Sequence, residues 1–215
     1  MTGARRLLVL RHGETDHNAS GVWQGQLDSA LSARGREQAY GAAAALAAYA
    51  PVLVVASDLS RARDTGQVVA AAAGAPLETD ERFREIHAGA WQGLTAAQVR
   101  EDYPQDVDRL MRGEDFKRGG HGESVAEVAV RVAAGAADLL RRLDAGQTAV
   151  VATHGVAGRA LVAELVGMPQ SLAWTALAGL RNCRWAELVE VRSGWRLEAW
   201  NVGAPEATTH AGDVA

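Results

Sequence analysis

Three short apolar runs, each followed at once by an unusual group of polar residues, constrain this chain more than any other feature. The runs are Leu7–Leu10, Val52–Ala56 and Ala149–Ala152. Each is rich in valine, leucine or alanine, and each is predicted to form a strand that is buried on both faces.

Helical patterns alternate with these runs. Residues 32–48 are nearly all good helix formers. Small and apolar residues recur at spacings of three and four over residues 59–73, with Ser57 as the predicted N-cap, and again over residues 125–143 after Ser124. Because strands and helices alternate along the chain, we expect parallel strands in an α/β sheet.

The rest of the chain adds a hairpin, an insertion and a tail. Residues 185–191 and 195–200 are predicted to be two further strands joined by a tight turn. Residues 95–123 are polar and partly helical and are predicted to form a cap-like insertion. We expect residues 1–202 to form one domain and the small, polar residues 203–215 to form a flexible tail.

Composition and charge exclude several classes of protein. Hydrophobic residues make up 48% of the chain, so a sizeable core can be buried, but no apolar run approaches the roughly 20 residues of a membrane span. The four apolar residues Leu7–Leu10 are too few for a signal-peptide core, so a cytoplasmic protein is expected. The net charge of −4 gives no basic stripe for nucleic acid, and Cys183, the only cysteine, excludes an intrachain disulfide.

The polar residues that follow the three runs include two histidines and two arginines. Arg11 and His12 follow the first run, Arg61 follows the second, and His154 follows the third. Ligands of open α/β sheets bind beyond the carboxyl ends of the strands, so parallel strands would bring these four side chains to one edge of the sheet.

This set of side chains suits a phosphoryl group. Guanidinium groups bind phosphate oxygens through two parallel hydrogen bonds and keep their charge at any working pH. A neutral imidazole can attack phosphorus and form a covalent intermediate, while a second imidazole donates to an equatorial oxygen. Backbone N–H groups at the start of a helix after Gly155 would add an anion site. Glu85 is the candidate proton donor for the leaving oxygen, since a carboxyl beside a phosphate dianion holds its proton more tightly.

Eight blocks of sequence, in order along the chain, resemble the motifs of the histidine phosphatase superfamily, also called the phosphoglycerate mutase-like family. The resemblance covers residues from about 5 to 201. The blocks are Leu10-Arg11-His12-Gly13-Glu14-Thr15, Asn18 with Gln24-Gly25, Leu31-Ser32 with Gly35, Ser57-Asp58-Leu59 with Arg61-Ala62, Arg84-Glu85-Ile86 with Gly89 and Trp91, Gly122-Glu123-Ser124, Thr153-His154-Gly155, and Asn182-Cys183.

The resemblance implies a three-layer αβα sandwich with a mostly parallel central sheet, and a role for each matching residue. His12 would be transiently phosphorylated, and Glu85 would protonate the leaving group and later activate water. The phosphate pocket would comprise Arg11, Asn18, Gln24, Gly25, Arg61, His154 and Gly155. Neither a metal nor an organic cofactor is expected. The partner would be a small phosphoester, and a homodimer is a reasonable expectation.

Within the family, the sequence favours a phosphatase over a mutase. A cofactor-dependent phosphoglycerate mutase would carry a longer insertion between Glu85 and Glu123 and a Phe-x-Gly-Trp pattern in place of residues 23–26. Residues 24–28, 91–95 and 195–201 resemble a narrower branch, the actinobacterial glucosyl-3-phosphoglycerate phosphatases. His121 departs from the usual Gly-Gly-Glu-Ser of that branch, so another sugar phosphate or phosphoserine stays open as the substrate.

Two other classes of protein also stay open. A metal hydrolase would use His12 and His17 around Glu14, although their spacing is not the His-Glu-x-x-His of a zinc helix. A protein that binds phosphorylated ligands without turnover would keep the same pocket. The sequence leaves undecided whether His17, Trp23, His87 or His121 contacts the leaving group.

Overall fold

The computed structural model describes residues 3–203 and contains a six-stranded sheet with the strand order β3-β2-β4-β1-β5-β6. β3, β2, β4 and β1 are mutually parallel, whereas β5 is antiparallel to β1 and β6 is antiparallel to β5. The strands are β1 (Arg6–Arg11), β2 (Leu53–Ala56), β3 (Leu77–Thr79), β4 (Thr148–Thr153), β5 (Trp185–Val191) and β6 (Gly194–Val202).

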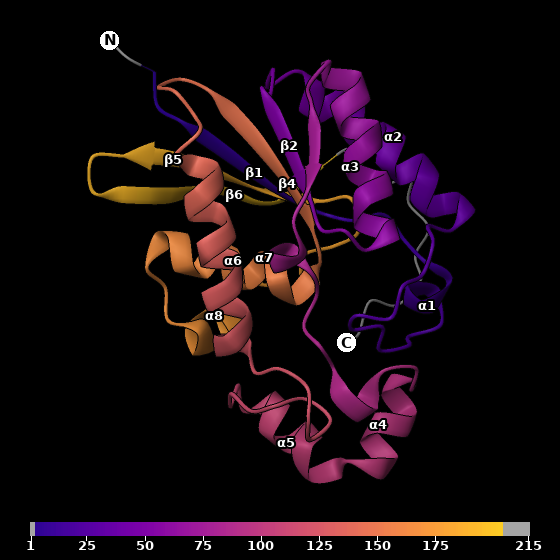
Figure 1. Cartoon of the computed structure of the whole chain (residues 1–215). Coiled ribbons are helices and arrows are strands. Elements are labelled where there is room, and N and C mark those ends of the chain that lie inside the picture. The colour runs from indigo at the N-terminus through magenta and orange to yellow at the C-terminus, as the bar shows by residue number, and fades with distance from the viewer. Residues whose placement is uncertain (1–2, 204–215) are drawn as a thin grey trace.

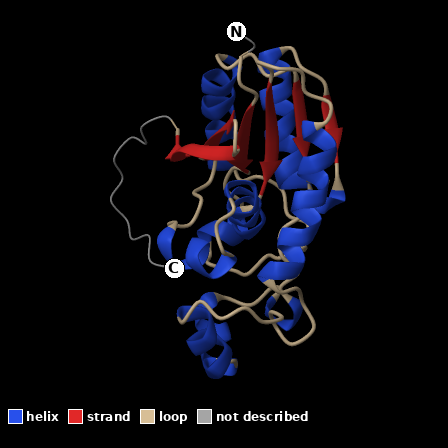
Figure 2. Ribbon diagram, turned by 90° about the vertical axis from the view of Figure 1, so that its left-hand side faces the viewer, coloured by secondary structure: helices blue, strands red, loops and turns tan. Residues whose placement is uncertain are grey.

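Helices cover both faces of this sheet and give it three layers (Figures 1 and 2). The helices are α1 (Asp16–Ala19), α2 (Ala33–Ala47), α3 (Ser60–Ala73), α4 (Ala96–Asp102), α5 (Pro104–Met111), α6 (Val125–Leu140), α7 (Gly155–Val166) and α8 (Gln170–Ala176). Two short 3-10 helices, η1 (Glu81–Phe83) and η2 (Gly89–Trp91), lie between β3 and α4.

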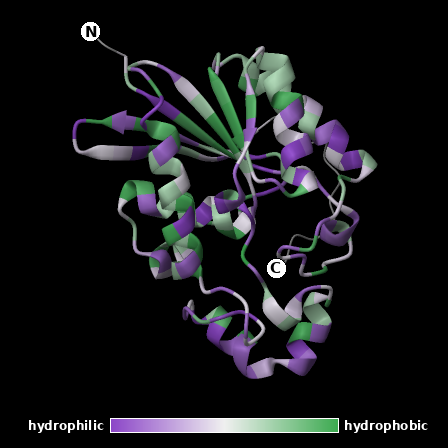
Figure 3. Ribbon diagram, viewed as in Figure 1, coloured by the Kyte–Doolittle hydropathy of each residue, from purple (hydrophilic) through white to green (hydrophobic). Residues whose placement is uncertain are grey.

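Side chains that alternate along the central strands fill two separate cores. Leu7 and Val9 pack with α6 and α7 on one face of the sheet, whereas Leu8 and Leu10 pack with α2 and α3 on the other. All four side chains are fully buried. Burial on both faces explains why these strands are continuous apolar runs, and the central strands are correspondingly hydrophobic in Figure 3.

The cap has a small core of its own. Trp91 and Phe116 pack there with Ala88 and Val99, and residues of α4 and α5 lie around them. The ring centroids of Trp91 and Phe116 lie 6.0 Å apart in an edge-to-face arrangement. In Figure 1 the cap helices α4 and α5 lie apart from the sheet, below the end at which β1 and β4 finish.

The α/β class, the parallel pairing of the three apolar runs and the hairpin of β5 and β6 confirm the predictions from sequence. Two details were wrong or missing. The edge strand β3 was not predicted. Ser57 is not the N-cap of α3, because the helix begins at Ser60 and Leu59 occupies the cap position without a side-chain hydrogen bond. Ser124 does cap α6, through a capping box with Glu127.

The predicted tail at residues 203–215 lies, apart from Gly203, outside the described residues. Of the helices that the structure describes, none combines the length and the apolar character needed to cross a membrane.

Candidate active site

The parallel register of β1 and β4 brings His12 and His154 together. Arg11 lies opposite Thr153, and the backbone N–H of His12 donates to the Thr153 carbonyl at 2.9 Å. The residue that follows each strand is a histidine, so the two imidazoles become neighbours: their ring centroids lie 5.1 Å apart, with 61° between the planes. Both side chains are buried, at 3% and 0% exposure. The predicted convergence at the carboxyl edge of the sheet is therefore present.

A backbone carbonyl fixes the tautomer of His12. The His12 Nδ1 atom lies 2.6 Å from the Gly13 oxygen. A carbonyl oxygen can only accept, so Nδ1 carries the proton and Nε2 keeps a lone pair. Burial, with the positive charges of Arg11 and Arg61, holds the pKa of His12 well below its ordinary value, although the Gly13 carbonyl acts in the other direction. His12 therefore presents a neutral, nucleophilic nitrogen.

His154 is held by Ser57 and has one nitrogen left over. Its Nε2 atom lies 2.9 Å from the Ser57 hydroxyl oxygen, which also accepts from the Leu59 N–H. The His154 Nδ1 atom is buried and has no hydrogen-bond partner among the described residues. Burial and the nearby charges of Arg61 and Arg11 hold the pKa of His154 well below its ordinary value. If the hydroxyl donates to Nε2, the proton on Nδ1 is available to a ligand.

Arg61 is a buried cation held by carbonyl groups. Its two terminal nitrogens donate to the Gly25 and Leu27 oxygens, each at 2.8 Å, and the side chain is 1% exposed. Its Nε atom is buried and has no partner within the described part of the chain. Burial lowers the pKa of Arg61, partly offset by the carboxylates of Glu85 and Asp28. The guanidinium thus keeps an N–H for a ligand.

Glycine is required at position 25 for the loop that supports Arg61. The backbone of Gly25 has a φ of +51°, and a Cβ there would lie 2.3 Å from the Gln92 side-chain oxygen. Any larger residue would therefore displace the carbonyl that Arg61 uses.

Arg11 is the last residue of β1. It donates to the Leu180 carbonyl at 2.7 Å. A Cβ at Gly155 would lie 3.8 Å from the Arg11 guanidinium carbon and 3.6 Å from a Glu85 carboxylate oxygen. The three residues therefore adjoin one another, as predicted. Asn182, which belongs to the last matching block, fixes this loop by donating to the His12 carbonyl at 2.9 Å.

Asn18 and Gln24 lie on the loop that returns from His12. Asn18 forms a capping box with Thr15 at the start of α1, which uses the oxygen of its amide. The Gln24 side-chain oxygen accepts from the hydroxyls of Thr15 and Ser29, at 3.1 and 2.6 Å. In both amides the oxygen is occupied by the protein, and this orientation leaves the amide NH₂ as the group for an anion.

The Glu85 carboxylate lies at the N-terminus of α7. It accepts hydrogen bonds from the backbone N–H groups of Val156 and Ala157, at 3.1 and 3.0 Å, and from that of Ile86. The start of this helix was predicted to bind phosphate through such groups. In the structure, the anion on these N–H groups is the Glu85 carboxylate itself.

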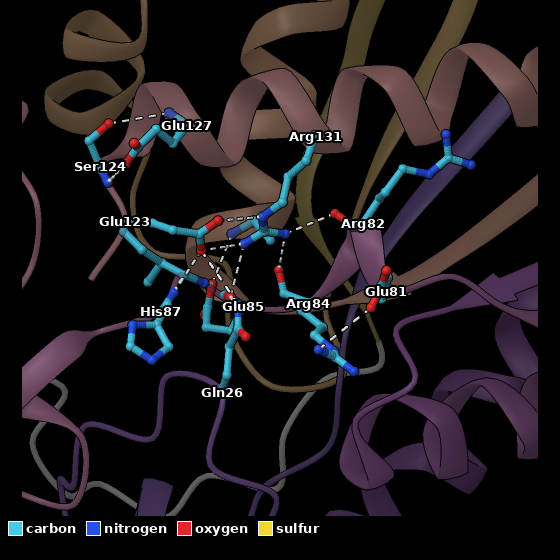
Figure 4. A network of polar contacts seen from close by, with 12 residues as sticks. Gln26, Glu81, Arg82, Arg84, Glu85, His87, Glu123, Ser124, Glu127 and Arg131 are labelled. Carbon is cyan, nitrogen blue, oxygen red and sulfur yellow. Dashed lines mark hydrogen bonds and ion pairs between the residues drawn. The ribbon is translucent and has the colours of Figure 1, made fainter. Parts of the chain in front are cut away.

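Glu123, from one of the matching blocks, and Arg131, which the sequence analysis did not single out, hold the backbone around Glu85 (Figure 4). Arg131 donates to the carbonyl oxygens of Arg84 and Glu85, at 2.6 and 2.9 Å, and its guanidinium pairs with Glu123. Glu123 in turn accepts the His87 N–H at 2.8 Å. Burial alone would raise the pKa of Glu123, but the hydrogen bonds from Arg131 and His87 lower it overall.

Of the four undecided residues, Trp23 is packed into the cap rather than free. Its ring meets the fully buried Trp91 edge-to-face at 5.1 Å, so Trp91 is a core residue of the cap. His87 and His121 lie beside each other, with ring centroids 5.9 Å apart. His17 lies in the last turn of α1, and its Nδ1 atom is buried without a partner among the described residues.

The arrangement can bind a tetrahedral oxyanion. The Arg61 Nε and His154 Nδ1 atoms are buried without a partner among the described residues, so each can donate to an oxygen of a ligand. Within residues 3–203, no three histidine, cysteine, aspartate or glutamate side chains are grouped so that they would hold a metal ion.

Known proteins share this sequence pattern over nearly the whole chain. The model of the family described as "Histidine phosphatase superfamily (branch 1)" matches residues 7–203. The glucosyl-3-phosphoglycerate phosphatase of Mycobacterium tuberculosis is 39% identical, and the match covers 94% of this chain and 96% of that protein. The protein named "Probable phosphoglycerate mutase GpmB" of Yersinia enterocolitica is 31% identical over 95% of this chain and 94% of its own length.

A solved structure has the same architecture. Mycobacterial glucosyl-3-phosphoglycerate phosphatase complexed with VO3 superposes with a TM-score of 0.87 at 40% identity, covering 93% of this chain and all of that one.

The two buried histidines predict a dependence of stability on pH. Folding lowers the pKa of both histidines. As the pH falls below about 6.5, the ordinary pKa of a histidine, both side chains are therefore protonated in the unfolded chain before they are protonated in the folded protein. The contribution of each neutral histidine to the free energy of unfolding should be fully present above pH 6.5. It should fall by about 1 kcal/mol for each histidine between pH 6.5 and 5.5. Urea unfolding at several pH values measures this loss. A variant with both His12→Asn and His154→Asn should lose about 2 kcal/mol less over the same interval, and equal losses would contradict the assignment.

Proposed function

The chain belongs to the histidine phosphatase superfamily, and on that premise we propose that it is a metal-independent phosphomonoester hydrolase that works through a phosphohistidine at His12. One observation carries the proposal. The neutral His12 imidazole, with a free Nε2 lone pair, packs against the His154 ring and lies within electrostatic range of Arg61, and the Arg61 Nε and His154 Nδ1 atoms have no partner among the described residues.

The phosphate is proposed to bind between Arg11, Arg61 and His154. Two guanidinium groups supply the positive charge that Mg²⁺ supplies in other phosphoryl transfers, and His154 adds a neutral donor. The amides of Asn18 and Gln24, whose oxygens are held by hydroxyl and backbone groups, turn their NH₂ groups to the remaining oxygens. Gly25 supports Arg61 through its carbonyl, and Gly155 leaves room beside Arg11.

In the first step, His12 Nε2 attacks phosphorus in line. A bond forms between this nitrogen and phosphorus while the bond from phosphorus to the ester oxygen breaks, and Glu85 protonates the departing oxygen.

In the second step, Glu85 takes a proton from water as the water oxygen attacks phosphorus. The bond between phosphorus and nitrogen breaks, inorganic phosphate leaves, and His12 regains its lone pair. Arg131 and Glu123 hold the backbone on both sides of Glu85, so its carboxyl stays in reach of both the leaving oxygen and the water.

We propose a small phosphorylated metabolite as the substrate, with glucosyl-3-phosphoglycerate as the first candidate. The mycobacterial relatives that bear this name share 38–39% of their residues with the chain over nearly its whole length. Within the proposed single domain of residues 1–202, the cap at residues 95–123 would supply the walls that select the leaving group.

A mutase is the second candidate, because relatives named as probable phosphoglycerate mutases also match. The cap argues for the hydrolase. It consists of two short helices around four buried side chains, which is a smaller cover than the long, arginine- and tyrosine-rich lid expected of a cofactor-dependent mutase. A smaller cover leaves water access to the phosphohistidine.

Purified protein should hydrolyse phosphomonoesters in excess EDTA. We expect the highest kcat/KM on glucosyl-3-phosphoglycerate in a panel with 3-phosphoglycerate, phosphoserine and sugar phosphates, measured by phosphate release.

His12→Ala should reduce turnover at least about 10³-fold with the fold intact, because the nucleophile is lost. Near-normal activity of His12→Ala, or loss of activity in EDTA, would exclude this mechanism. Formation of 2-phosphoglycerate only with added 2,3-bisphosphoglycerate would assign the chain to the mutases.

Glu85→Gln should act according to the leaving group. Loss of a general acid costs about 10²- to 10⁴-fold on alkyl phosphates, whose leaving oxygen must be protonated. It should cost far less on p-nitrophenyl phosphate, whose leaving group departs as an anion. Steady-state kinetics on both substrates measures the difference. Equal losses would remove Glu85 from the acid role.

We further propose that the chain works as a homodimer in the cytoplasm, where charged metabolites of this kind are retained. Met111 on α5 and Val130 on α6 are exposed at 79% and 73%, and each is a candidate contact between two copies. Size-exclusion chromatography with light scattering should give about twice the 22.6 kDa of one chain. Met111→Ser or Val130→Ser should lower the measured mass if that side chain lies in the contact between copies. A wild-type mass of one chain at all concentrations would contradict the proposal.

A further inference from the structure

Two arginines outside the phosphate pocket lie over one tryptophan ring. The guanidinium carbon of Arg159, on α7, lies 3.9 Å from the Trp174 ring centroid, and that of Arg118, in the cap, lies 5.5 Å from it. Arg118 also lies 4.2 Å from the Phe116 ring centroid, with Arg109 at 4.1 Å from the same ring. Aromatic rings position these cations without neutralising them.

Arg118 and Arg159 differ from Arg109 in their lack of carboxylate partners. Arg109 pairs with Asp106 and Glu114. Over residues 3–203, Arg118 and Arg159 form no ion pair, and each has one hydrogen-bond acceptor, a backbone carbonyl. Arg118 is nevertheless 2% exposed.

The nearby carboxylates of Asp115 and Asp106 already bind other groups of the protein. The carboxylate of Asp115 accepts the N–H groups of Val125 and Ala126 at the start of α6, at 2.7 and 3.0 Å. Arg118 lies close enough to Arg159 to act on it electrostatically, and two largely buried cations near one ring are costly unless an anion joins them. An anion from outside the chain would therefore be stabilised by Arg118 and Arg159.

The position of the pair relates it to the leaving group rather than to the phosphate. Arg159 follows Gly155 by four residues on α7, about 6 Å along the helix axis. Glu85 is near enough to act electrostatically on both Arg61 and Arg159. The proposed proton donor is therefore close to both the phosphate pocket and Arg159. Burial lowers the pKa of Arg159 to about 10, so it stays charged at neutral pH.

We propose that Arg118 and Arg159, stacked on Trp174, bind the carboxylate of a phosphorylated hydroxy acid while its phosphate occupies the pocket of Arg11 and Arg61. The inference rests on the proposed function and names the substrate class of that site. In 3-phosphoglycerate and its 2-O-substituted derivatives, two carbon atoms separate the ester oxygen from the carboxylate. An ester oxygen held at Glu85 therefore directs the carboxylate along α7 towards Arg159.

The experiment compares a phosphoester that carries the carboxylate with one that lacks it. Binding of 3-phosphoglycerate and of glycerol 3-phosphate is measured by calorimetry, and kcat/KM is measured on both and on p-nitrophenyl phosphate. Wild type should prefer 3-phosphoglycerate in both assays. Arg159→Gln and Arg118→Gln should each weaken 3-phosphoglycerate binding and kcat/KM about 10- to 100-fold, the value of one charge-assisted hydrogen bond, with little change on the other two esters.

Arg109→Gln is the matched control, because Arg109 stacks on the same Phe116 ring as Arg118 but already has carboxylate partners. This variant should leave the preference for 3-phosphoglycerate unchanged. Arg118→Lys and Arg159→Lys, checked for folding by circular dichroism, should restore part of the preference. Equal losses on all esters, or an unchanged preference in Arg159→Gln, would overturn the inference. Carboxylate-dependent binding without phosphate release from any ester would support the subsite and overturn the hydrolase, so the two failures are distinguishable.

Discussion

The parallel hydrogen bonding between β1 and β4 sets the distance between the two imidazoles, and the other contacts of the site depend on it. The backbone, rather than side-chain contacts, sets the positions of the two histidines. Each is the residue that leaves a strand in the middle of the sheet, and the register of Arg11 with Thr153 makes them neighbours. A slip of one residue would turn each side chain to the opposite face. The buried valines and leucines on both faces prevent such a slip, so the core determines the geometry of the chemistry.

The site keeps its cations without neutralising them. Arg61 is held by two backbone carbonyl oxygens, which orient its guanidinium group without cancelling its charge. Arg118 and Arg159 are held by aromatic rings and one carbonyl each. The anion that does lie in the site, Glu85, is held by backbone N–H groups. Main-chain dipoles therefore position the reacting charges, which leaves the side-chain charges available to a ligand.

Sequence reasoning located what lies at strand ends and missed what depends on distant packing. His12, Arg61 and His154 follow apolar runs whose period and composition predict buried parallel strands, so their convergence could be predicted. β3 is only three residues long and partly exposed, and it carries no such pattern. Ser57 is the partner of His154 rather than the predicted N-cap, because α3 begins three residues later, at Ser60. Nothing near Arg131 or Arg159 in the sequence distinguishes them from the other arginines, since their contacts come from segments far away in the chain.

The separate core of the cap has an evolutionary consequence. Its four buried side chains share no cluster with those that support the sheet, so mutations there can be accepted without disturbing the register on which the nucleophile depends. Residues that face the leaving group can diversify while the machinery for phosphorus stays constant. Such independence allows one scaffold to serve many metabolites by small steps, each of which leaves a folded and chemically competent protein for selection to act on.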